Sequence, residues 1–374
     1  MNSLFDTKHI KESLPSDKLE GNFAKISAIG VGGGGCNMIN HMIDQGIDKI
    51  DLVVANTDQQ VLDISKAPKT IQLGRELTKG LGAGMDPDKG RDSALEAYQE
   101  LLELFKDAGI VFVAAGLGGG TGTGAAPIVA KAAKESGALT VSVITKPFSW
   151  EGKKRATIAN VGLEELKEVS DSIIIVPNER LLEIVDDNIG FKDAFKVVDD
   201  VLYQAVNGMS EVILNHGNGD INTDFADVQR IMKHKGMALM GIGKAKGEDA
   251  VMNALQDAIN SPLLDKISLS GAKGIVIHFH MHPTVPMQEI GRVMKQLDDS
   301  LDNDTELIFG TTTDEELNGK EIKITIVATG FDNNPNQNLN TQSTTADEPK
   351  LEQTNKNYYS IPPLMRDYNI KYHL

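Results

Sequence analysis

Short apolar runs alternate with longer amphipathic stretches through the first half of the chain. The runs are rich in valine and isoleucine and nearly continuous, which is typical of strands buried on both faces of a sheet. They cover residues 25–31, 51–57, 110–116, 139–145 and 172–177, and helical periodicity appears in 92–105 and 160–169. This alternation predicts an α/β fold of the Rossmann-like, doubly wound class with a mainly parallel sheet.

A long helical pattern over residues 191–216 separates this half from the rest of the chain. Beyond it, helical stretches alternate again with strand-like runs. The helical stretches are 224–236, 248–261 and 285–301, and the runs are 274–282, 305–313 and 321–330. We therefore expect a central helix followed by a smaller α+β domain.

Composition places the remaining boundaries. Residues from about 332 to 357 are mostly Asn, Gln, Thr and Pro, a composition that cannot bury enough apolar surface to order itself. The predicted parts are an N-terminal extension, a first domain, the central helix, the α+β domain, a disordered linker and a terminal peptide. Their ranges are 1–22, 23–190, 191–216, 217–330, 331–358 and 359–374.

Net charge and cysteine content exclude several classes of protein. The formal charge of −16 argues against nucleic-acid binding, which usually uses a basic face. The single cysteine, Cys36, excludes an internal disulfide and a cysteine-rich zinc site. No apolar stretch approaches the roughly 18 residues that span a bilayer, and the N-terminus has no apolar signal core. We expect a cytoplasmic protein without direct membrane insertion.

The glycine-rich stretch "GLGGGTGTGAAP" at 116–127 lies between a predicted strand and a predicted helix that begins near Ala125. Bare backbone N–H groups at a helix N-terminus bind phosphate, and Thr121 and Thr123 add hydroxyl groups. The alternative, a flexible linker, rarely sits tightly between a buried strand and a helix. The stretch therefore predicts a phosphate-binding loop.

A second glycine-rich stretch, "GVGGGGCN" at 30–37, follows the first predicted strand. Gly30, Gly32 and Gly35 formally match the dinucleotide fingerprint, although the next strand ends in Asn56 and offers an acid only at Asp58. No P-loop motif occurs. Two glycine loops on one sheet suggest a polyphosphate held from both sides, with a dinucleotide-dependent oxidoreductase as the alternative.

Two further features have a structural and a functional interpretation. His278, His280 and His282 alternate on a predicted strand, which indicates either a polar strand face or part of a metal site that would need further ligands. Cys36 is small enough to let a phosphate approach, and we expect it to pack rather than to act as a nucleophile. We predict no metal site built from protein ligands.

Several motifs together resemble the tubulin and FtsZ family of GTPases, and in particular its bacterial cell-division members. The strongest is "GGGTGTG" at 118–124. The others are "GVGGGGCN", "NTD" at 56–58, "GLGAGMDPDKGR" at 80–91, "TKPFSWEGKKR" at 145–155, "PNERLL" at 177–182 and "NTDFADV" at 222–228. The resemblance covers roughly residues 23–330 in order and implies that the first domain binds GTP.

The resemblance also implies roles for individual residues. It places residues 33–37 on one side of the nucleotide and residues 120–122 on the phosphates. Glu151 would lie near the ribose and Arg155 near the phosphates. Phe195 and Asp199 would lie against the guanine, where a carboxylate can accept from N1 and N2. The implied nucleotide-binding residues are Gly33, Gly34, Gly35, Cys36, Asn37, Gly120, Thr121, Gly122, Thr123, Glu151, Arg155, Asn178, Phe195 and Asp199. From the residues alone, Glu151 and Arg155 also suit an ordinary i, i+4 ion pair, and Phe195 and Asp199 a core ring beside a solvated acid.

Catalysis in the family depends on a second subunit. The resemblance implies that Asn222, Asp224 and Asp227 reach the nucleotide of the next subunit in a head-to-tail filament and polarise the attacking water, with Mg²⁺ on the β- and γ-phosphates. From the residues alone, acids at 224 and 227 could equally stabilise a helix N-terminus. A scaffold that binds GTP without hydrolysing it is a further alternative.

The terminal peptide completes the resemblance. "SIPPLMRDYN" keeps Ile361, Pro362, Leu364 and Arg366 of the family's conserved tail, with Pro363 at a position that is less often varied. The family's tail recruits membrane tethers and division regulators. The implied function is therefore a filament that scaffolds the division ring on the inner face of the membrane.

Overall fold

The computed structural model describes residues 25–47, 49–182, 189–214, 220–234, 236–261, 264, 269 and 271–331. The predicted N-terminal extension and terminal peptide lie outside these residues, as does the predicted linker apart from Phe331. The end of the predicted central helix, at 215–216, is also outside them.

A ten-stranded sheet runs through the described chain in the order β3-β2-β1-β4-β5-β6-β7-β10-β8-β9. Its strands are β1 (Ile26–Val31), β2 (Asp51–Asn56), β3 (Lys69–Gln72), β4 (Ile110–Gly116), β5 (Leu139–Lys146), β6 (Ser172–Pro177), β7 (Met237–Lys246), β8 (Gly274–Met281), β9 (Glu306–Thr313) and β10 (Glu321–Phe331). All neighbouring strands from β3 to β7 pair in parallel, as do β8 and β9, whereas β10 is antiparallel to β7 and β8. The predicted α/β fold with a mainly parallel sheet is confirmed.

Two strands were not predicted, for different reasons. β3 has four residues, too few for a periodic pattern. β7 contains Gly241 and Gly243, and glycine inside a segment weakens its strand signal. A Cβ at these positions would lie 2.1 Å from the carbonyl oxygen of Ala258 and 1.9 Å from that of Ala254. The glycines of β7 are therefore required by close packing of α10 on the strand.

The helices follow the predicted order with shifted ends, except that Gly32–Asp44, Gln59–Asp63 and Asn178–Leu182 were not predicted as helices. They are α1 (Gly32–Asp44), α2 (Gln59–Asp63), α3 (Pro87–Glu96), α4 (Tyr98–Phe105), α5 (Thr121–Glu135), α6 (Lys153–Val169), α7 (Asn178–Leu182), α8 (Phe191–Leu214), α9 (Phe225–Met232), α10 (Ala250–Ile259) and α11 (Met287–Asp298), with a 3₁₀ turn at Ser149–Glu151. The helix predicted over 92–105 is in fact two helices that meet at Ala97. α3 begins earlier than predicted because Asp86 caps it and Pro87 occupies its first turn.

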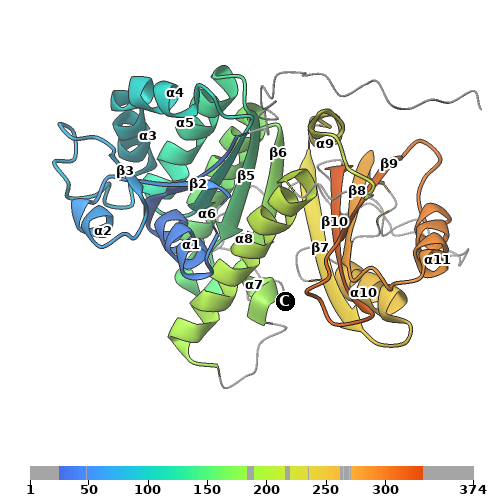
Figure 1. Cartoon of the computed structure of the whole chain (residues 1–374). Helices are drawn as coiled ribbons and strands as arrows, with labels where there is room; N and C mark the ends of the chain where they lie inside the picture. The colour runs from blue at the N-terminus through green and yellow to red at the C-terminus, as the bar shows by residue number, and fades with distance from the viewer. Residues whose placement is uncertain are drawn as a thin grey trace, which may run out of the picture. The chain divides into compact units, whose positions relative to one another are not determined.

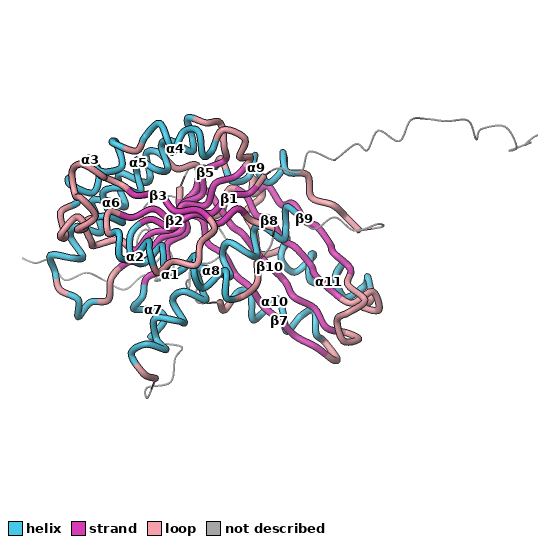
Figure 2. Tube along the Cα trace, turned by 60° about the vertical axis from the view of Figure 1, so that its left-hand side comes forward, coloured by secondary structure: helices cyan, strands magenta, loops and turns pink. Residues whose placement is uncertain are grey.

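Helices cover both faces of the sheet (Figures 1 and 2). α1 and α8 contribute to the core on one face of β1, β2, β4, β5 and β6. α3, α4, α5 and α6 contribute to the core on the opposite face. α10 and α11 cover the other end of the sheet, around β7, β8 and β10. Two covered faces explain why the parallel strands read as continuous apolar runs.

The central helix α8 joins the two ends of the sheet. Its buried residues, among them Val198 and Met209, belong to one core with residues of β5, β7 and β10. β6 and β7 pair through two residue pairs, Ile173 with Met237 and Ile174 with Ala238. The two predicted halves therefore share one sheet, and the exact domain limits stay predictions.

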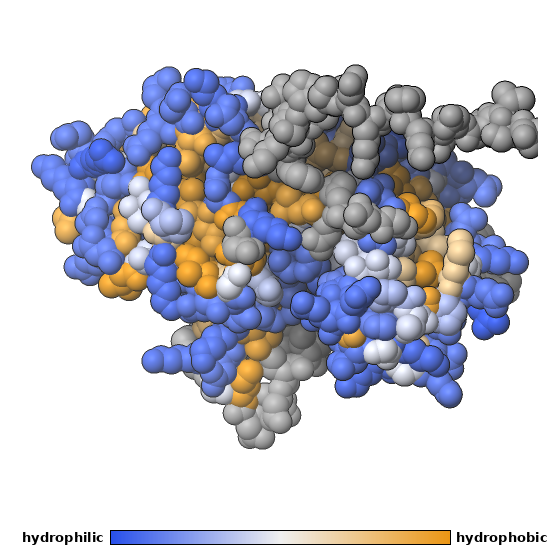
Figure 3. All heavy atoms as spheres, viewed as in Figure 1, coloured by the Kyte–Doolittle hydropathy of each residue, from blue (hydrophilic) through white to orange (hydrophobic). Residues whose placement is uncertain are grey.

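The surface in Figure 3 is mainly hydrophilic, with hydrophobic residues gathered over the half that carries α1 and β2. None of the helices within the described residues combines the length and the apolar character that a membrane crossing requires.

Candidate nucleotide site

Both glycine-rich segments begin where a parallel strand ends. β1 and β4 are neighbours in the sheet, with Val31 opposite Ala115. The turns that follow them therefore lie side by side at the carboxyl edge of the sheet, where α/β proteins bind ligands.

The structure corrects the expected limits of both glycine segments. α1 already begins at Gly32 and α5 at Thr121, not near Ala125. Gly33–Asn37 and Thr121–Gly124 therefore lie in the first turns of helices rather than in loops. The helices begin early because these glycines allow the two turns to pack against each other and against their neighbours.

The spacing of backbone atoms shows this packing directly. A Cβ at Gly32 would lie 2.7 Å from the amide nitrogen of Gly122, and one at Gly35 only 2.3 Å from the carbonyl oxygen of Ala114. A Cβ at Gly122 would lie 2.4 Å from the carbonyl oxygen of Gly116, and one at Gly120 would lie 2.8 Å from the amide nitrogen of Asp86. Most of the predicted phosphate-binding glycines are thus required by the fold itself.

Gly33 and Gly119 behave differently. A Cβ at either position would meet no atom within 4 Å, and neither residue has the positive φ that favours glycine. Gly33 is exposed and Gly119 is half-buried. Packing does not require glycine at these two positions, which leaves open space where a ligand can approach the backbone.

The two helices that start here leave their N-terminal N–H groups uncapped. The residues that precede them, Val31 and Gly120, make no side-chain capping bond, and neither first turn carries an acidic residue. Each helix N-terminus carries roughly half a positive charge. Two adjacent, uncapped N-termini form a site for an anion.

The two predicted threonines differ in what they can do. Thr121 is half-buried, and its hydroxyl lies 2.7 Å from that of Thr57. Thr123 is buried, and its hydroxyl accepts a hydrogen bond of 2.8 Å from the Gly118 amide. Thr123 thus supports the turn, whereas Thr121 borders the open side, and the nucleotide contacts of both stay predictions.

Cys36 lies on the buried side of α1, and burial raises the pKa of its thiol to about 11. A thiol with so high a pKa is a poor nucleophile, which agrees with the expected packing role. Asn37, one residue later, is exposed. Cys36 therefore packs in the interior under the first turns of α1, and the exposed Asn37 can face a ligand.

Glu151 and Arg155 form the ion pair that their spacing allows, with 2.7 Å between Glu151 Oε2 and Arg155 Nη1. The pair bridges Gly152, which has a φ of +102° and separates the 3₁₀ turn from α6. Glu151 Oε1 also accepts from the Phe148 amide at 2.8 Å. Arg155 lies beside the glycine turn, because a Cβ at Gly118 would be 3.0 Å from Arg155 Cγ.

Phe195 and Asp199 lie in the first turns of α8, next to the same segment. The ring of Phe195 packs edge-on against Phe148 with centroids 5.6 Å apart. Burial raises the pKa of Asp199 to about 6, an effect that the nearby His41 of α1 partly offsets. His41 Nε2 lies 3.4 Å from Asp200 Oδ1, which ties α1 to this part of α8.

Asn178 begins α7 directly after β6, at the same edge of the sheet. It is buried, and its Oδ1 atom has no hydrogen-bond partner within the described part of the chain. A buried, unpaired carbonyl oxygen is costly unless something donates to it. The structure thus brings Asn178, Phe195 and Asp199 to the edge that carries the glycine turns.

The predicted catalytic residues lie elsewhere. Asp220 Oδ2 accepts from the Thr313 amide, and the Thr311 amide donates to Ile221, so the segment before α9 runs along β9. Thr312 pairs with His280, and His280 with Lys323, which forms an ion pair with Glu211 near the end of α8. Phe195 and Glu211 are separated by about 24 Å along the helix. Asn222, Asp224 and Asp227 are therefore not brought to the glycine turns of their own chain.

The histidines of 278–282 find separate partners rather than a common ligand. His278 lies 3.0 Å from Thr312, His280 3.3 Å from Asp314 and His282 2.7 Å from Thr284. Burial lowers the pKa of His278 to about 4, so it is neutral. No group of three or more His, Cys, Asp or Glu side chains within the described residues could hold a metal ion.

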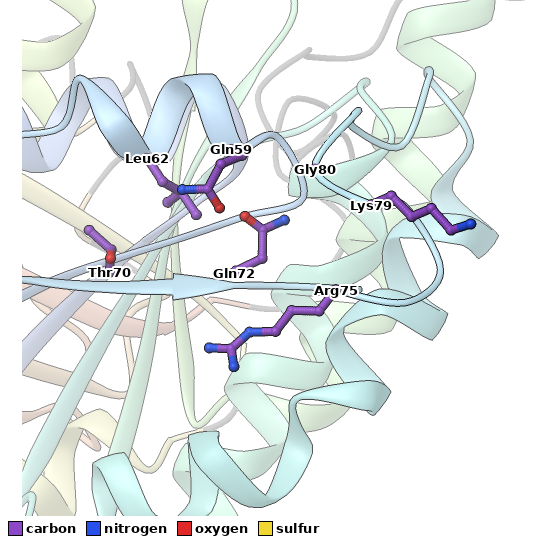
Figure 4. Close-up of a pocket in the computed structure, with 7 residues that line it drawn as sticks. All are labelled: Gln59, Leu62, Thr70, Gln72, Arg75, Lys79 and Gly80. Carbon is purple, nitrogen blue, oxygen red and sulfur yellow. The ribbon is translucent and has the colours of Figure 1, made fainter.

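A separate pocket of about 500 Å³ lies at the open edge of the sheet, beside β3 and α2 (Figure 4). Gln72 of β3 and Gln59 of α2 face each other across it, whereas Lys79 points away. Its lining residues are Gln59, Leu62, Thr70, Gln72, Arg75, Lys79 and Gly80, and none of them is a predicted site residue. The glycine turns, not this pocket, combine the features of a phosphate site.

Sequence reasoning missed Thr57, which contacts Thr121, although "NTD" at 56–58 contributed to the resemblance. The neighbouring Asp58 has a local structural role. Its carboxylate caps α2 by accepting from the Gln60 amide at 2.9 Å. This capping role weakens the oxidoreductase alternative, in which the acid would face a ribose.

Family models match both halves of the chain. Residues 25–186 match the GTPase domain of the Tubulin/FtsZ family, and residues 236–332 match the FtsZ family C-terminal domain. The structure is similar to an empty FtsZ dimer from M. jannaschii, with a TM-score of 0.75, 43% identity, and coverage of 82% of this chain and 88% of that one.

More distant structures share the fold. CetZ2 from Haloferax volcanii, solved as a GTPγS-bound protofilament, gives a TM-score of 0.70 at 20% identity and covers 83% of this chain and 94% of its own. CetZ1 from the same organism, a GDP-bound monomer, gives 0.71 at 18% identity, with 83% and 95% covered. Both family domains and the 43% identity over most of the FtsZ chain show that this protein belongs to the tubulin/FtsZ family of GTPases.

Proposed function

We propose that GTP binds with its phosphates between the first turns of α1 and α5. The observation that carries this proposal is the pair of adjacent, uncapped helix N-termini next to the open positions Gly33 and Gly119. Gly34, Gly35, Gly120 and Gly122 let the two turns approach, Thr121 offers a hydroxyl, and Arg155 lies beside Gly118. An acidic protein can bind polyphosphate this way because the positive charge comes from the backbone.

The base is proposed to lie over Phe195, with Asp199 accepting from guanine N1 and N2. Adenine has no matching pair of donors, so a carboxylate here selects guanine. Glu151 would hold the ribose, and Asn37 and Asn178 would complete the contacts. The unpaired Oδ1 atom of Asn178 supports this, because a donor from the ligand would satisfy it.

Hydrolysis is proposed to need a second subunit. The support is the distance between the glycine turns and Asn222, Asp224 and Asp227, which lie beyond the far end of α8. Asp224 stands at the N-cap of α9 but makes no side-chain capping bond, and both it and Asn222 are exposed. A helix-stabilising role alone would use the carboxylate as a cap. We propose that these residues face the γ-phosphate of the next subunit.

Exposed apolar residues occur near both proposed contact surfaces. Leu81 and Met85 follow β3, and Trp150 stacks on Phe148 beside the glycine turn, with exposed fractions of 85%, 50% and 60%. Ile221 and Phe309 are exposed beside Asp224. Two different apolar surfaces suit a head-to-tail contact, which generates a filament when it does not close.

Mg²⁺ is proposed to bind through the phosphates of the nucleotide. Mg²⁺ bound to a nucleotide keeps several waters and takes few protein ligands, so the ion would need no cluster of acidic side chains here. When bound, the ion would neutralise charge that develops on the β- and γ-phosphates.

The cellular role is proposed to be a dynamic cytoplasmic filament that scaffolds the division ring at the membrane. The FtsZ C-terminal domain supports it. The terminal peptide 359–374, outside the described residues, would recruit membrane tethers and regulators, and no nucleic-acid partner is expected of a chain with a charge of −16.

The shared site can be tested by mixing two variants. Asp224→Ala should bind GTP and assemble but hydrolyse poorly, and Thr121→Ala is chosen to assemble with slow turnover. An equal mixture should regain turnover at roughly a quarter of interfaces, where an intact pocket meets an intact Asp224. Asp257→Ala, an exposed acid on α10, is the matched control and should leave turnover unchanged.

Dilution gives an independent readout. Turnover per molecule should fall to zero below an assembly threshold if the site is shared. No regain of turnover at any mixing ratio, together with turnover independent of concentration, would show that each subunit hydrolyses GTP alone. A wild type that binds GTP but never releases phosphate would instead favour the scaffold without hydrolysis.

A further inference from the structure

Thr57 is buried at the end of β2 and was not among the predicted site residues. Its hydroxyl oxygen lies 2.7 Å from that of Thr121, the first residue of α5. Thr57 is fully buried, whereas Thr121 is partly exposed at the proposed phosphate site. The two hydroxyls therefore join the interior of the fold to the surface where GTP is proposed to bind.

The backbone of Thr57 is held by an unusual number of donors. Its carbonyl oxygen accepts from the Gln72 side chain at 3.2 Å, the Thr78 hydroxyl at 3.2 Å and the Gly82 amide at 3.1 Å. These donors come from β3 and from the loop that follows it. The loop beside the β3 pocket thus fixes the position from which the Thr57 hydroxyl reaches Thr121 (Figure 4).

Counting the donors and acceptors of the two hydroxyls shows which one donates to the other. Each hydroxyl has one hydrogen to donate. Within the described residues, Thr121 is the one partner of the Thr57 hydroxyl. If Thr121 donated to Thr57, the Thr57 hydrogen would be buried without an acceptor, which costs the desolvation of that group. The arrangement that satisfies both hydroxyls has Thr57 donating to Thr121.

We propose that Thr57 is a positioning residue that donates to Thr121 and so turns the Thr121 hydrogen outward, toward a phosphate oxygen of GTP. This inference rests on the proposed GTP site. It makes Thr121 a directed donor, set before the ligand arrives, in place of a hydroxyl that rotates freely. The phosphate then gains a hydrogen bond without the cost of ordering its donor.

A double-mutant cycle tests the relay. GTP dissociation constants are measured by titration for the wild type, Thr57→Val, Thr121→Val and the double variant. Thr57→Val keeps the shape and removes the donor, and we expect it to weaken GTP binding about three- to tenfold. The double variant should bind GTP as Thr121→Val does, because without the Thr121 hydroxyl there is no hydrogen left to direct.

Two controls separate the relay from a structural role. Thr57→Ser keeps the hydroxyl and should bind GTP within about twofold of the wild type. Thr140→Val removes a buried hydroxyl that donates to the Ala138 carbonyl at the other edge of the strands, and it should not change GTP affinity.

The outcomes are distinct. Equal losses from Thr57→Val in the wild-type and the Thr121→Val backgrounds would overturn the relay, as would a Thr57→Ser variant that folds but binds like Thr57→Val. Thermal unfolding of each variant shows whether it folds. A wild type without GTP affinity would refute the proposed function itself.

Discussion

The N-termini of α3 and α5 lie side by side, but only α3 is capped by a side chain. Asp86 closes the start of α3 by accepting from the amides of Asp88 and Lys89 at 3.0 and 3.3 Å. α5 begins after Gly120 with no side-chain cap. The two starts are close together, because a Cβ at Gly120 would come within 2.8 Å of the Asp86 amide nitrogen. One helix carries its own carboxylate, and its neighbour leaves its positive end for an external anion.

The same contrast separates α2 from α1. Asp58 caps α2, whereas α1 begins without a side-chain cap and without an acid in its first turn. A missing cap costs about 1 kcal/mol of stability. A binding site can explain why the chain tolerates this cost at two adjacent helices, and the predictions below test that explanation.

The largest effect is expected from placing a carboxylate in the open position of α1. Gly33→Asp should lower GTP affinity by at least about a hundredfold, because a negative charge in the first turn repels phosphate. The same carboxylate interacts favourably with the helix dipole, by about 0.3–1 kcal/mol, so the free energy of unfolding should not fall. Nucleotide titration and urea denaturation measure the two effects.

Gly33→Asn is the uncharged control for this variant. It should weaken GTP binding far less than Gly33→Asp does. Equal losses from the two variants would mean that α1 does not face a phosphate.

Two alanine variants then separate structural from ligand-facing glycines. Gly35→Ala places a Cβ 2.3 Å from the Ala114 carbonyl oxygen, and we expect a loss of about 2 kcal/mol in the free energy of unfolding. Gly33→Ala meets no atom within 4 Å and should change stability little. Urea denaturation without nucleotide checks both, and similar losses would remove the distinction between the two kinds of glycine.

The raised pKa of Asp199 predicts a pH dependence of GTP affinity. Donors on guanine favour the charged carboxylate, so GTP binding should lower this pKa from its value of about 6 in the free protein. Affinity should then be constant well above pH 6 and fall up to tenfold per pH unit below it. His41 and Asp200 lie nearby, so Asp199→Asn, which cannot titrate, is the control. An unchanged pH profile in that variant would assign the effect to another group.

How far the sequence predicted the molecule can be judged at particular elements. The runs that became β1, β2, β4, β5 and β6 were predicted because strands buried on both faces carry an unbroken apolar signal. β7 was not, because Gly241 and Gly243 serve contacts with α10 that no local pattern reveals. Periodicity reports the burial of a segment but not the identity of its neighbour.

The candidate site shows the same limit. The glycine segments predicted a phosphate site, but the sequence could not separate Gly33, which is open, from Gly35, which packs against Ala114. It could not find Thr57, because its contact with Thr121 joins the end of β2 to the start of α5, far apart in the sequence. The Asp86-Pro87 pair is a local signal for a helix start, since a capping acid is followed by proline, but the helix was predicted to begin only at residue 92.

The smallest expected effect concerns that cap. Asp86→Ala should lower the free energy of unfolding by about 1 kcal/mol, because two amides of α3 lose their acceptor. GTP affinity should stay within about twofold of the wild type if the capped helix contributes nothing to the phosphate site. Asp86→Asn, which can still cap, should recover most of the stability. If Asp86→Ala weakened GTP binding at unchanged stability, the carboxylate next to Gly120 would belong to the nucleotide site. The starts of α3 and α5 would then both take part in binding GTP, and the contrast between a capped and a ligand-binding helix would not hold.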